Sequence, residues 1–196
     1  MDAPRLFVLC RHAESELNVL RRVNGDPTIE VPLTRRGEQQ AQMLGDQLRN
    51  VPIDVCAHSR FGRTRRTAEL VLAGRAVEIR EQPLLDDVDV GDLEGASLDA
   101  YRAWKQSHAR RDAFPGGESL DDAARRYARG FEALLALPAS VVLAVVHEIP
   151  IRYAANAAAA SSDLDWPVHA IGNCVPYLFD EEALRRAIKG IRRAVG

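Results

Sequence analysis

The sequence predicts an α/β fold of three layers, in which helices cover both faces of a mostly parallel central sheet. Two apolar runs, residues 6–10 and 141–146, have no polar alternation, as is typical of strands buried on both faces. Segments with helical spacing of apolar residues separate the predicted strands. Strands that alternate with helices are joined by right-handed crossovers, which make neighbouring strands parallel.

The remaining elements follow in order along the chain. We expect further strands at residues 54–58, 77–79 and 173–179, and helices at 34–50, 61–73, 98–111, 119–137, 150–160 and 181–195. Thr34 and Ser119 are good N-caps, and Pro150 suits the first turn of a helix. The helix at 98–111 is very polar, so we place it outside the sheet as a small lid, within residues 96–118. We expect residues 1–196 to form a single domain.

Composition excludes several functional classes. The net charge of −2 argues against a protein that coats nucleic acid or binds a membrane surface. The chain has no apolar stretch long enough to span a membrane, and we expect it to be cytoplasmic. Its three cysteines, Cys10, Cys56 and Cys174, are typical of core residues in a reduced protein rather than of a disulfide framework or a zinc site.

Polar side chains that can carry chemistry follow several predicted strands. Arg11 and His12 end the first strand, Ser59 and Arg60 follow the second, and His147 ends the strand at 141–146. Ligands of open α/β sheets bind at the carboxyl ends of strands. These residues are therefore expected to meet at one edge of the sheet, where the candidate site lies.

Five motifs in this order resemble those of the histidine phosphatase superfamily, the phosphoglycerate mutase-like proteins. They are Arg11-His12-Ala13-Glu14-Ser15 with Asn18; Ser59 to Ala68 with Arg63 and Thr67; Leu85-Asp86-Asp87 leading to Gly91 and Glu94-Gly95; Gly116-Gly117-Glu118-Ser119; and His147. The resemblance covers residues 6 to about 160. Each motif alone is weak, but the five together make chance agreement implausible.

The resemblance implies a set of catalytic roles. His12 would attack a phosphomonoester and become a phosphohistidine that water then hydrolyses. Arg11, Arg63 and His147, with Asn18 as a neutral donor, would hold the three equatorial phosphate oxygens without a metal or cofactor. The same cations would keep His12 neutral, because a further positive charge would be repelled.

The proton donor departs from the family pattern. The family normally uses a glutamate at the position of Asp87, whose side chain is one methylene shorter. Asp86, Asp89 and Glu94 are nearby alternatives, and the whole acidic run could instead be a solvated loop. The register of the motif favours Asp87.

A second departure concerns the residue after the second histidine. The family usually has glycine where this chain has Glu148. We expect the Glu148 side chain to point away from the pocket; if it faced the pocket, it would repel a second anionic group or serve as an auxiliary acid. Arg22, Asn24 and Gly25 align with a segment that grips the substrate in mutases, and they either contact the leaving group or form a solvated loop.

The resemblance favours a metal-independent phosphatase that acts on a small phosphomonoester. A phosphoglycerate mutase is disfavoured, because the lid segment is short and would leave a phosphohistidine open to water. Two more functions stay open, a phosphohistidine-protein phosphatase and a catalytically silent module that binds a phosphorylated ligand. Neither nucleic acid nor a membrane is an expected partner. The sequence contains no coiled-coil seam, and the oligomeric state stays open.

Overall fold

The computed structural model describes residues 4–196 and contains a five-stranded sheet in the order β3-β2-β4-β1-β5. The first four strands are parallel and β5 is antiparallel to β1. The strands are β1 (Leu6–Arg11), β2 (Val55–His58), β3 (Glu78–Glu81), β4 (Val141–Val146) and β5 (Pro176–Asp180). The mostly parallel sheet confirms the predicted fold class.

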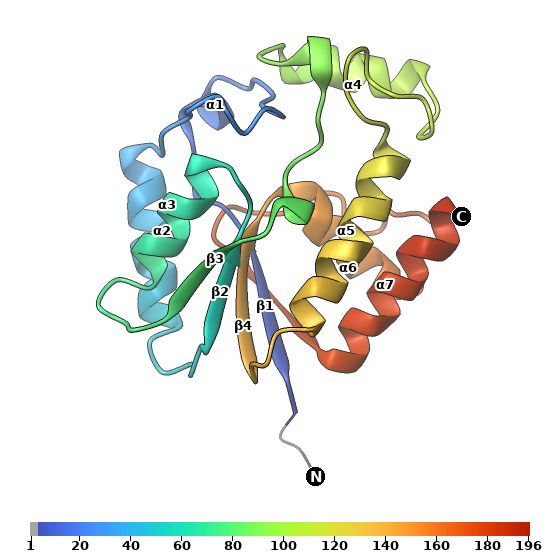
Figure 1. Ribbon diagram of the computed structural model, residues 1–196. Coiled ribbons are helices and arrows are strands. Elements are labelled where there is room, and N and C mark those ends of the chain that lie inside the picture. The colour runs from blue at the N-terminus through green and yellow to red at the C-terminus, as the bar shows by residue number, and fades with distance from the viewer. Residues whose placement is uncertain (1–3) are drawn as a thin grey trace.

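Helices cover the two faces of this sheet (Figure 1). One face carries α2 (Arg35–Gln47) and α3 (Gly62–Val71). The other carries α5 (Leu120–Leu135), α6 (Glu148–Ala158) and α7 (Glu181–Val195). Within residues 4–196, no helix is both long enough and apolar enough to cross a membrane.

The central strands are buried on both faces, as their apolar runs predicted. Phe7 and Leu9 of β1 belong to the core under α5, α6 and α7, whereas Val8 and Cys10 belong to the core under α2 and α3. All four side chains have no exposed surface. Removing this apolar surface from water is the main driving force for assembling the layers.

The bounds of several elements differ from the expectation by one to four residues, and three differences have a clear description. A short helix, α1 (Glu16–Val19), begins after Ser15, where the sequence pattern predicted no helix. The lid helix α4 (Leu98–Ser107) ends four residues early, because His108 has an extended backbone. The last strand begins at Pro176 rather than at residue 173, since Cys174 has a φ of 53°, which is incompatible with a strand.

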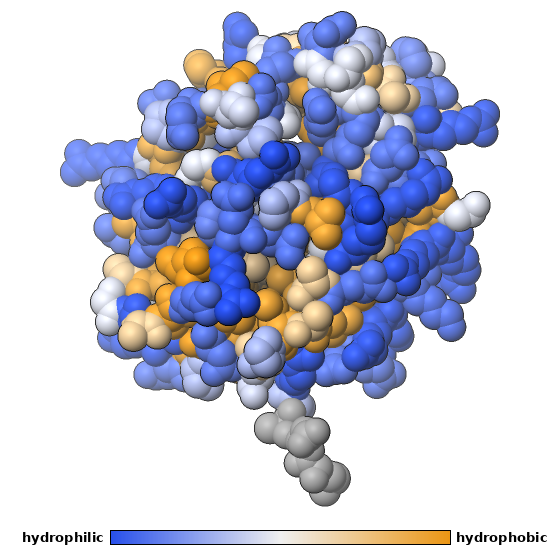
Figure 2. All heavy atoms as spheres, in the orientation of Figure 1, coloured by the Kyte–Doolittle hydropathy of each residue, from blue (hydrophilic) through white to orange (hydrophobic). Residues whose placement is uncertain are grey.

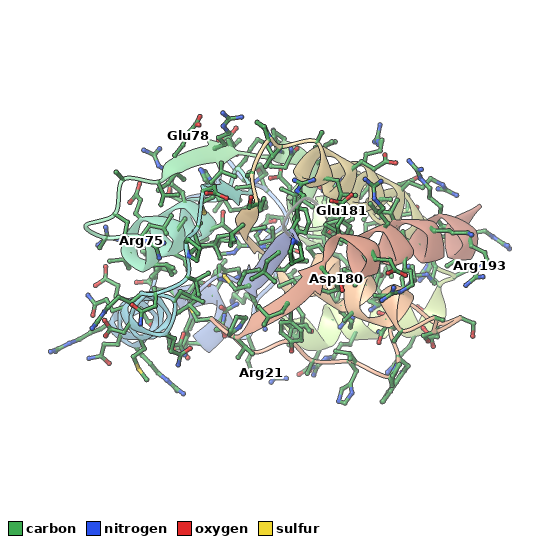
Figure 3. All side chains as sticks on the ribbon, turned by 90° about the horizontal axis from the view of Figure 1, so that it is seen from below. Arg21, Arg75, Glu78, Asp180, Glu181 and Arg193 are labelled. Carbon is green, nitrogen blue, oxygen red and sulfur yellow. The ribbon has the colours of Figure 1, made fainter. Side chains whose placement is uncertain are left out.

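Predicted capping residues start several helices. Thr34 Oγ1 accepts a hydrogen bond from the Gly37 N–H at 2.9 Å, and Ser119 caps α5 in the same way. Asp180 caps α7, and Figure 3 shows Asp180 and Glu181 at the start of this helix and Arg193 near its far end. Acids at the first turn and bases at the last turn complement the helix dipole.

The lid lies above the carboxyl ends of the parallel strands, where α1 and α4 are seen in Figure 1. Tyr101 and Trp104 of α4 stack on Phe114, with ring centroids 5.5 and 4.1 Å apart. This aromatic contact fixes α4 over the sheet edge. Figure 2 shows that apolar side chains gather lower on this face of the molecule, over β3 and β2.

The start of α2 supports the segment that follows His12. A Cβ atom on Gly37 would lie 2.1 Å from the Glu14 carbonyl oxygen, so this close approach requires glycine. We expect Gly37→Ala to lower the free energy of unfolding by about 1–3 kcal/mol, although alanine favours helices. Urea unfolding measures the change.

Gly62→Ala is the matched control, because its Cβ would meet only the end of the flexible Glu30 side chain. Its free energy of unfolding is expected to stay within about 0.5 kcal/mol of the parent protein. Equal stability of the two variants would show that the contact with Glu14 does not constrain residue 37.

Candidate functional site

The carboxyl ends of three adjacent strands bring the predicted site together. His12 follows β1, Ser59 follows β2 and His147 follows β4, and these strands are neighbours in the sheet. A cavity of about 330 Å³ opens at this edge, and both His12 and Arg63 line it. The convergence follows from topology, because parallel strands present their carboxyl ends on the same side.

His12 is held as a neutral imidazole with one unprotonated ring nitrogen. Its ring Nδ1 lies 2.8 Å from the Ala13 carbonyl oxygen, to which it donates. Its Nε2 accepts a hydrogen bond from Arg63 Nε at 3.1 Å, so this nitrogen carries no proton. Burial, Arg63 and Arg11 together hold the pKa of His12 well below its ordinary value. A neutral Nε2 is the form that can act as a nucleophile.

Arg63, in the first turn of α3, links the site residues. Besides His12, its guanidinium donates to the side-chain and backbone oxygens of Asn24 and lies 3.2 Å from His147 Nδ1 and 3.3 Å from Asp87 Oδ2. Burial lowers the pKa of Arg63 to about 10, which leaves it charged at neutral pH. One fixed cation therefore orients both histidines and the candidate acid.

His147 directly precedes α6 and is completely buried; its side chain makes no capping hydrogen bond to this helix. Because Arg63 can only donate, His147 Nδ1 is the acceptor of their contact, and Nε2 donates to Ser59 Oγ at 2.8 Å. Thr64 in turn contacts Ser59 at 2.9 Å. Burial and the nearby Arg63 lower the pKa of His147 well below its ordinary value.

Arg11 closes the cavity from the side of β1. Its Nη1 donates to the Ile171 carbonyl at 2.8 Å and lies 3.0 Å from Glu148 Oε2. Its Nε is buried without a hydrogen-bond partner among residues 4–196. Buried donors are rarely left unpaired, so this nitrogen fits an oxygen of a bound phosphate.

Asp87 is the candidate acid that lines the cavity. Burial raises the pKa of its carboxyl, although Arg63 acts in the opposite direction. The Asp87 carbonyl accepts a hydrogen bond from Arg126 Nη2 at 3.0 Å, and Arg126 also binds the carbonyls of Leu84 and Asp86. Arg126 of α5 therefore fixes the loop that presents the acid.

The other three acids of this region have structural partners instead. Asp86 binds Arg60 at 2.6 Å, and Asp89 accepts from the Gly91 N–H at 3.0 Å. Glu94 accepts from Asn24 Nδ2 and from the backbone N–H groups of Gly25 and Asp26. None of the three lines the cavity, so Asp87 is the one acid of this loop segment that does.

Glu148 lines the cavity, contrary to the expectation that it points away. It lies between two arginines, at 3.0 Å from Arg11 and 3.1 Å from Arg152. Arg152 is four residues further along α6, on the same helix face. The two arginines hold Glu148 inward and offset part of its charge, while the carboxylate stays at the cavity surface.

The residues predicted to contact substrate fall into two groups. Asn18, Arg22 and Asn24 line the cavity, and Arg22 also donates to the Gly95 carbonyl at 2.9 Å. Gly25 does not line it; its N–H is bound by Glu94, and a Cβ there would lie 2.2 Å from the Val88 carbonyl oxygen. Gly25 therefore allows two loops to approach closely.

One whole wall of the cavity was not expected from the sequence. Tyr101 and Lys105 of the lid helix, Arg152 of α6 and His169 line it but belong to none of the motifs. Of these four residues, only Arg152 could have been found from the sequence, because it lies four residues after Glu148 on a predicted helix and can form an ion pair with it. In the part of the chain that the structure describes, no three His, Cys, Asp or Glu side chains group so as to hold a metal ion.

Comparison with known proteins supplies relatives over most of the chain. "Probable phosphoglycerate mutase GpmB" of Erwinia tasmaniensis is 34% identical over 137 residues, which are 66% of this chain and 63% of that protein. The chain thus spans a little under two thirds of this relative. The α-ribazole phosphatase of Shigella flexneri superposes with a TM-score of 0.77 and 26% identity, covering 88% of this chain and 89% of that one.

A second solved structure, YhfR of Bacillus stearothermophilus, has a TM-score of 0.78 and 27% identity and covers 89% of this chain and 90% of that one. The family model for the histidine phosphatase superfamily, branch 1, matches residues 7–191. This match includes both histidines, Arg11, Arg63 and Asp87. The chain therefore belongs to branch 1 of the histidine phosphatase superfamily.

Proposed function

We propose that this protein is a phosphatase that hydrolyses a small phosphomonoester through a phosphohistidine on His12, without a metal cofactor. The observation that carries the proposal is the contact of His12 Nε2 with Arg63 Nε at 3.1 Å in a buried cavity. It presents an unprotonated nitrogen beside a fixed cation. The names of the relatives, an α-ribazole phosphatase and a phosphoglycerate mutase, support phosphoryl transfer of this kind.

In the first step His12 Nε2 exchanges its hydrogen bond from Arg63 for a bond to phosphorus, and the bond from phosphorus to the ester oxygen breaks. Asp87 gives its proton to that oxygen, so the leaving group departs as an alcohol. Arg11, Arg63 and His147 surround the phosphoryl group, whose oxygens carry the charge in the transition state. The unpartnered Arg11 Nε is a ready donor for one of these oxygens.

The second step hydrolyses the phosphohistidine. Water attacks phosphorus, the bond to Nε2 breaks and Asp87 takes the proton that the water loses. The products are inorganic phosphate and the starting enzyme. Asp87 must be protonated in the first step and ionised in the second. The raised pKa of its partly buried carboxyl suits a group that first donates and then accepts a proton.

A mutase is the second candidate, because the Erwinia relative carries that name. A mutase must keep water from the phosphohistidine until the phosphoryl group returns to the substrate. The lid over this cavity is a single helix of ten residues, α4. Release of free phosphate supports hydrolysis, whereas isomerisation of a phosphoglycerate without free phosphate supports the mutase.

The first test is phosphate release from p-nitrophenyl phosphate and from a panel of sugar phosphates and phosphoglycerates, assayed with EDTA present. We expect turnover by the parent protein and a loss of more than about 10³-fold in His12→Ala, because the nucleophile is removed. His108→Ala, which changes an exposed histidine of the lid region, is the control and should retain activity. Turnover that survives in His12→Ala would contradict the proposal.

The second test separates the acid from the nucleophile. p-Nitrophenolate leaves without a proton, but an alkoxide needs one, so Asp87→Asn should lower kcat/KM for an alkyl phosphate at least about 10²-fold and affect p-nitrophenyl phosphate much less. An equal loss on both substrates would exclude Asp87 as the proton donor.

The pH profile of the parent protein follows from the same two groups. The pKa of His12 lies below its ordinary value near 6.5, so the nucleophile stays neutral into the acid range. The pKa of Asp87 lies above its ordinary value near 3.8, so the acid stays protonated to higher pH than a free aspartic acid. Activity on alkyl phosphates should therefore be greatest in acid and fall as Asp87 ionises, a decline that is absent in Asp87→Asn.

A further inference from the structure

One wall of the cavity has no part in the chemistry at phosphorus. It is formed by Tyr101 and Lys105 of α4 and by Glu148 and Arg152 of α6, and we call it the α4–α6 wall. Tyr101 and Arg152 are only 9% and 8% exposed, so the wall is built of ordered side chains. It borders the same cavity as His12 and Asp87, where the leaving group of a bound phosphomonoester must lie.

Two buried donors in this wall lack partners. Neither the Tyr101 hydroxyl nor Arg152 Nε has a hydrogen-bond partner in the described chain, residues 4–196. Burial raises the pKa of the Tyr101 hydroxyl, so this group stays protonated and available as a donor. Because buried polar groups are nearly always paired, two orphaned donors on one cavity wall indicate acceptor oxygens on a ligand.

The charges around this wall balance. Arg152 binds Glu148 at 3.1 Å and Asp165 at 3.0 Å. Arg110 binds Asp165 at 2.6 Å and Asp121 at 3.1 Å, and Lys105 lies 3.9 Å from Asp165. Three cations, Lys105, Arg110 and Arg152, therefore face three carboxylates. These groups of the wall carry no excess charge with which to bind a second anion, and Arg21 and Arg102, which also line the cavity, share Asp99 at 3.2 and 3.6 Å.

A neutral leaving group with several hydroxyls fits these groups best. A hydroxyl can donate to the Glu148 carboxylate and accept from Tyr101 or Arg152 at the same time. A carboxylate or second phosphate would place a negative charge beside Glu148. An apolar leaving group would leave both buried donors unpaired and so would gain no hydrogen-bond energy from them.

We propose that the α4–α6 wall selects a neutral, polyhydroxylated leaving group of the sugar or polyol class, and that Tyr101 is a specificity-determining residue. This inference rests on the proposed function, since it concerns the part of the phosphomonoester that departs. It assigns the substrate to sugar or polyol monophosphates rather than to phosphorylated acids or bisphosphates.

The test compares Tyr101→Phe with the parent protein on glucose 6-phosphate, ribose 5-phosphate and p-nitrophenyl phosphate. Loss of one hydroxyl should lower kcat/KM for the sugar phosphates about 3- to 10-fold and leave p-nitrophenyl phosphate within about twofold. Tyr127→Phe is the matched control: it removes another buried, unpartnered hydroxyl of the described chain, but Tyr127 does not line the cavity. Tyr127→Phe should leave kcat/KM unchanged for all three substrates.

A second variant tests the charge balance. Glu148→Gln keeps the size of the side chain but leaves the wall with a positive excess. We expect the ratio of kcat/KM for 3-phosphoglycerate to that for glucose 6-phosphate to rise about tenfold. An unchanged ratio would overturn the argument from charge.

The outcomes distinguish the inference from the function on which it rests. If the parent protein hydrolyses p-nitrophenyl phosphate but prefers 3-phosphoglycerate to both sugars, or if Tyr101→Phe weakens all substrates equally, the leaving-group assignment is wrong and the phosphatase stands. If none of the four compounds yields phosphate, both proposals fail.

Discussion

The buried guanidinium of Arg63 is the interaction on which the rest of the site depends. A charge in the interior is tolerated only where partners surround it, and Arg63 has them in His12, Asn24, Asp87 and His147. Each partner comes from a different segment of the chain. Burial and this cation together lower the pKa of both histidines, and Arg63 opposes the rise that burial causes in the Asp87 pKa. Arg63, anchored in the first turn of α3, also orients the His12 lone pair.

The cavity divides into two halves with different electrostatics. Around His12, Arg11 and Arg63 each have one acid beside them, Glu148 and Asp87. When Asp87 is protonated for the first step, this half of the cavity has a positive excess that suits a phosphate dianion. On the α4–α6 wall, each cation is paired with a carboxylate. The donors that stay without a partner there are the Tyr101 hydroxyl and Arg152 Nε. The half around His12 suits the phosphoryl chemistry that all phosphomonoesters share. The α4–α6 wall can discriminate between their leaving groups.

The sequence predicted best what depends on strand ends and motifs. His12, Arg63 and His147 could be placed together because parallel strands and the helix that follows one of them share an edge. The α4–α6 wall could not be predicted. The position of Tyr101 depends on its stacking against Phe114, which precedes α5 in the chain. The inward turn of Glu148 depends on Arg11, 137 residues away along the chain, and no local pattern encodes that pairing.

The most direct test of the account is the stereochemical course at phosphorus. A phosphorothioate ester made chiral with an isotope of oxygen would be hydrolysed in water that contains another, and the configuration of the thiophosphate product determined. Attack by His12 followed by attack of water inverts phosphorus twice, so the account predicts net retention of configuration. Net inversion would show that water attacks the ester directly, and it would contradict the central claim that His12 is the nucleophile.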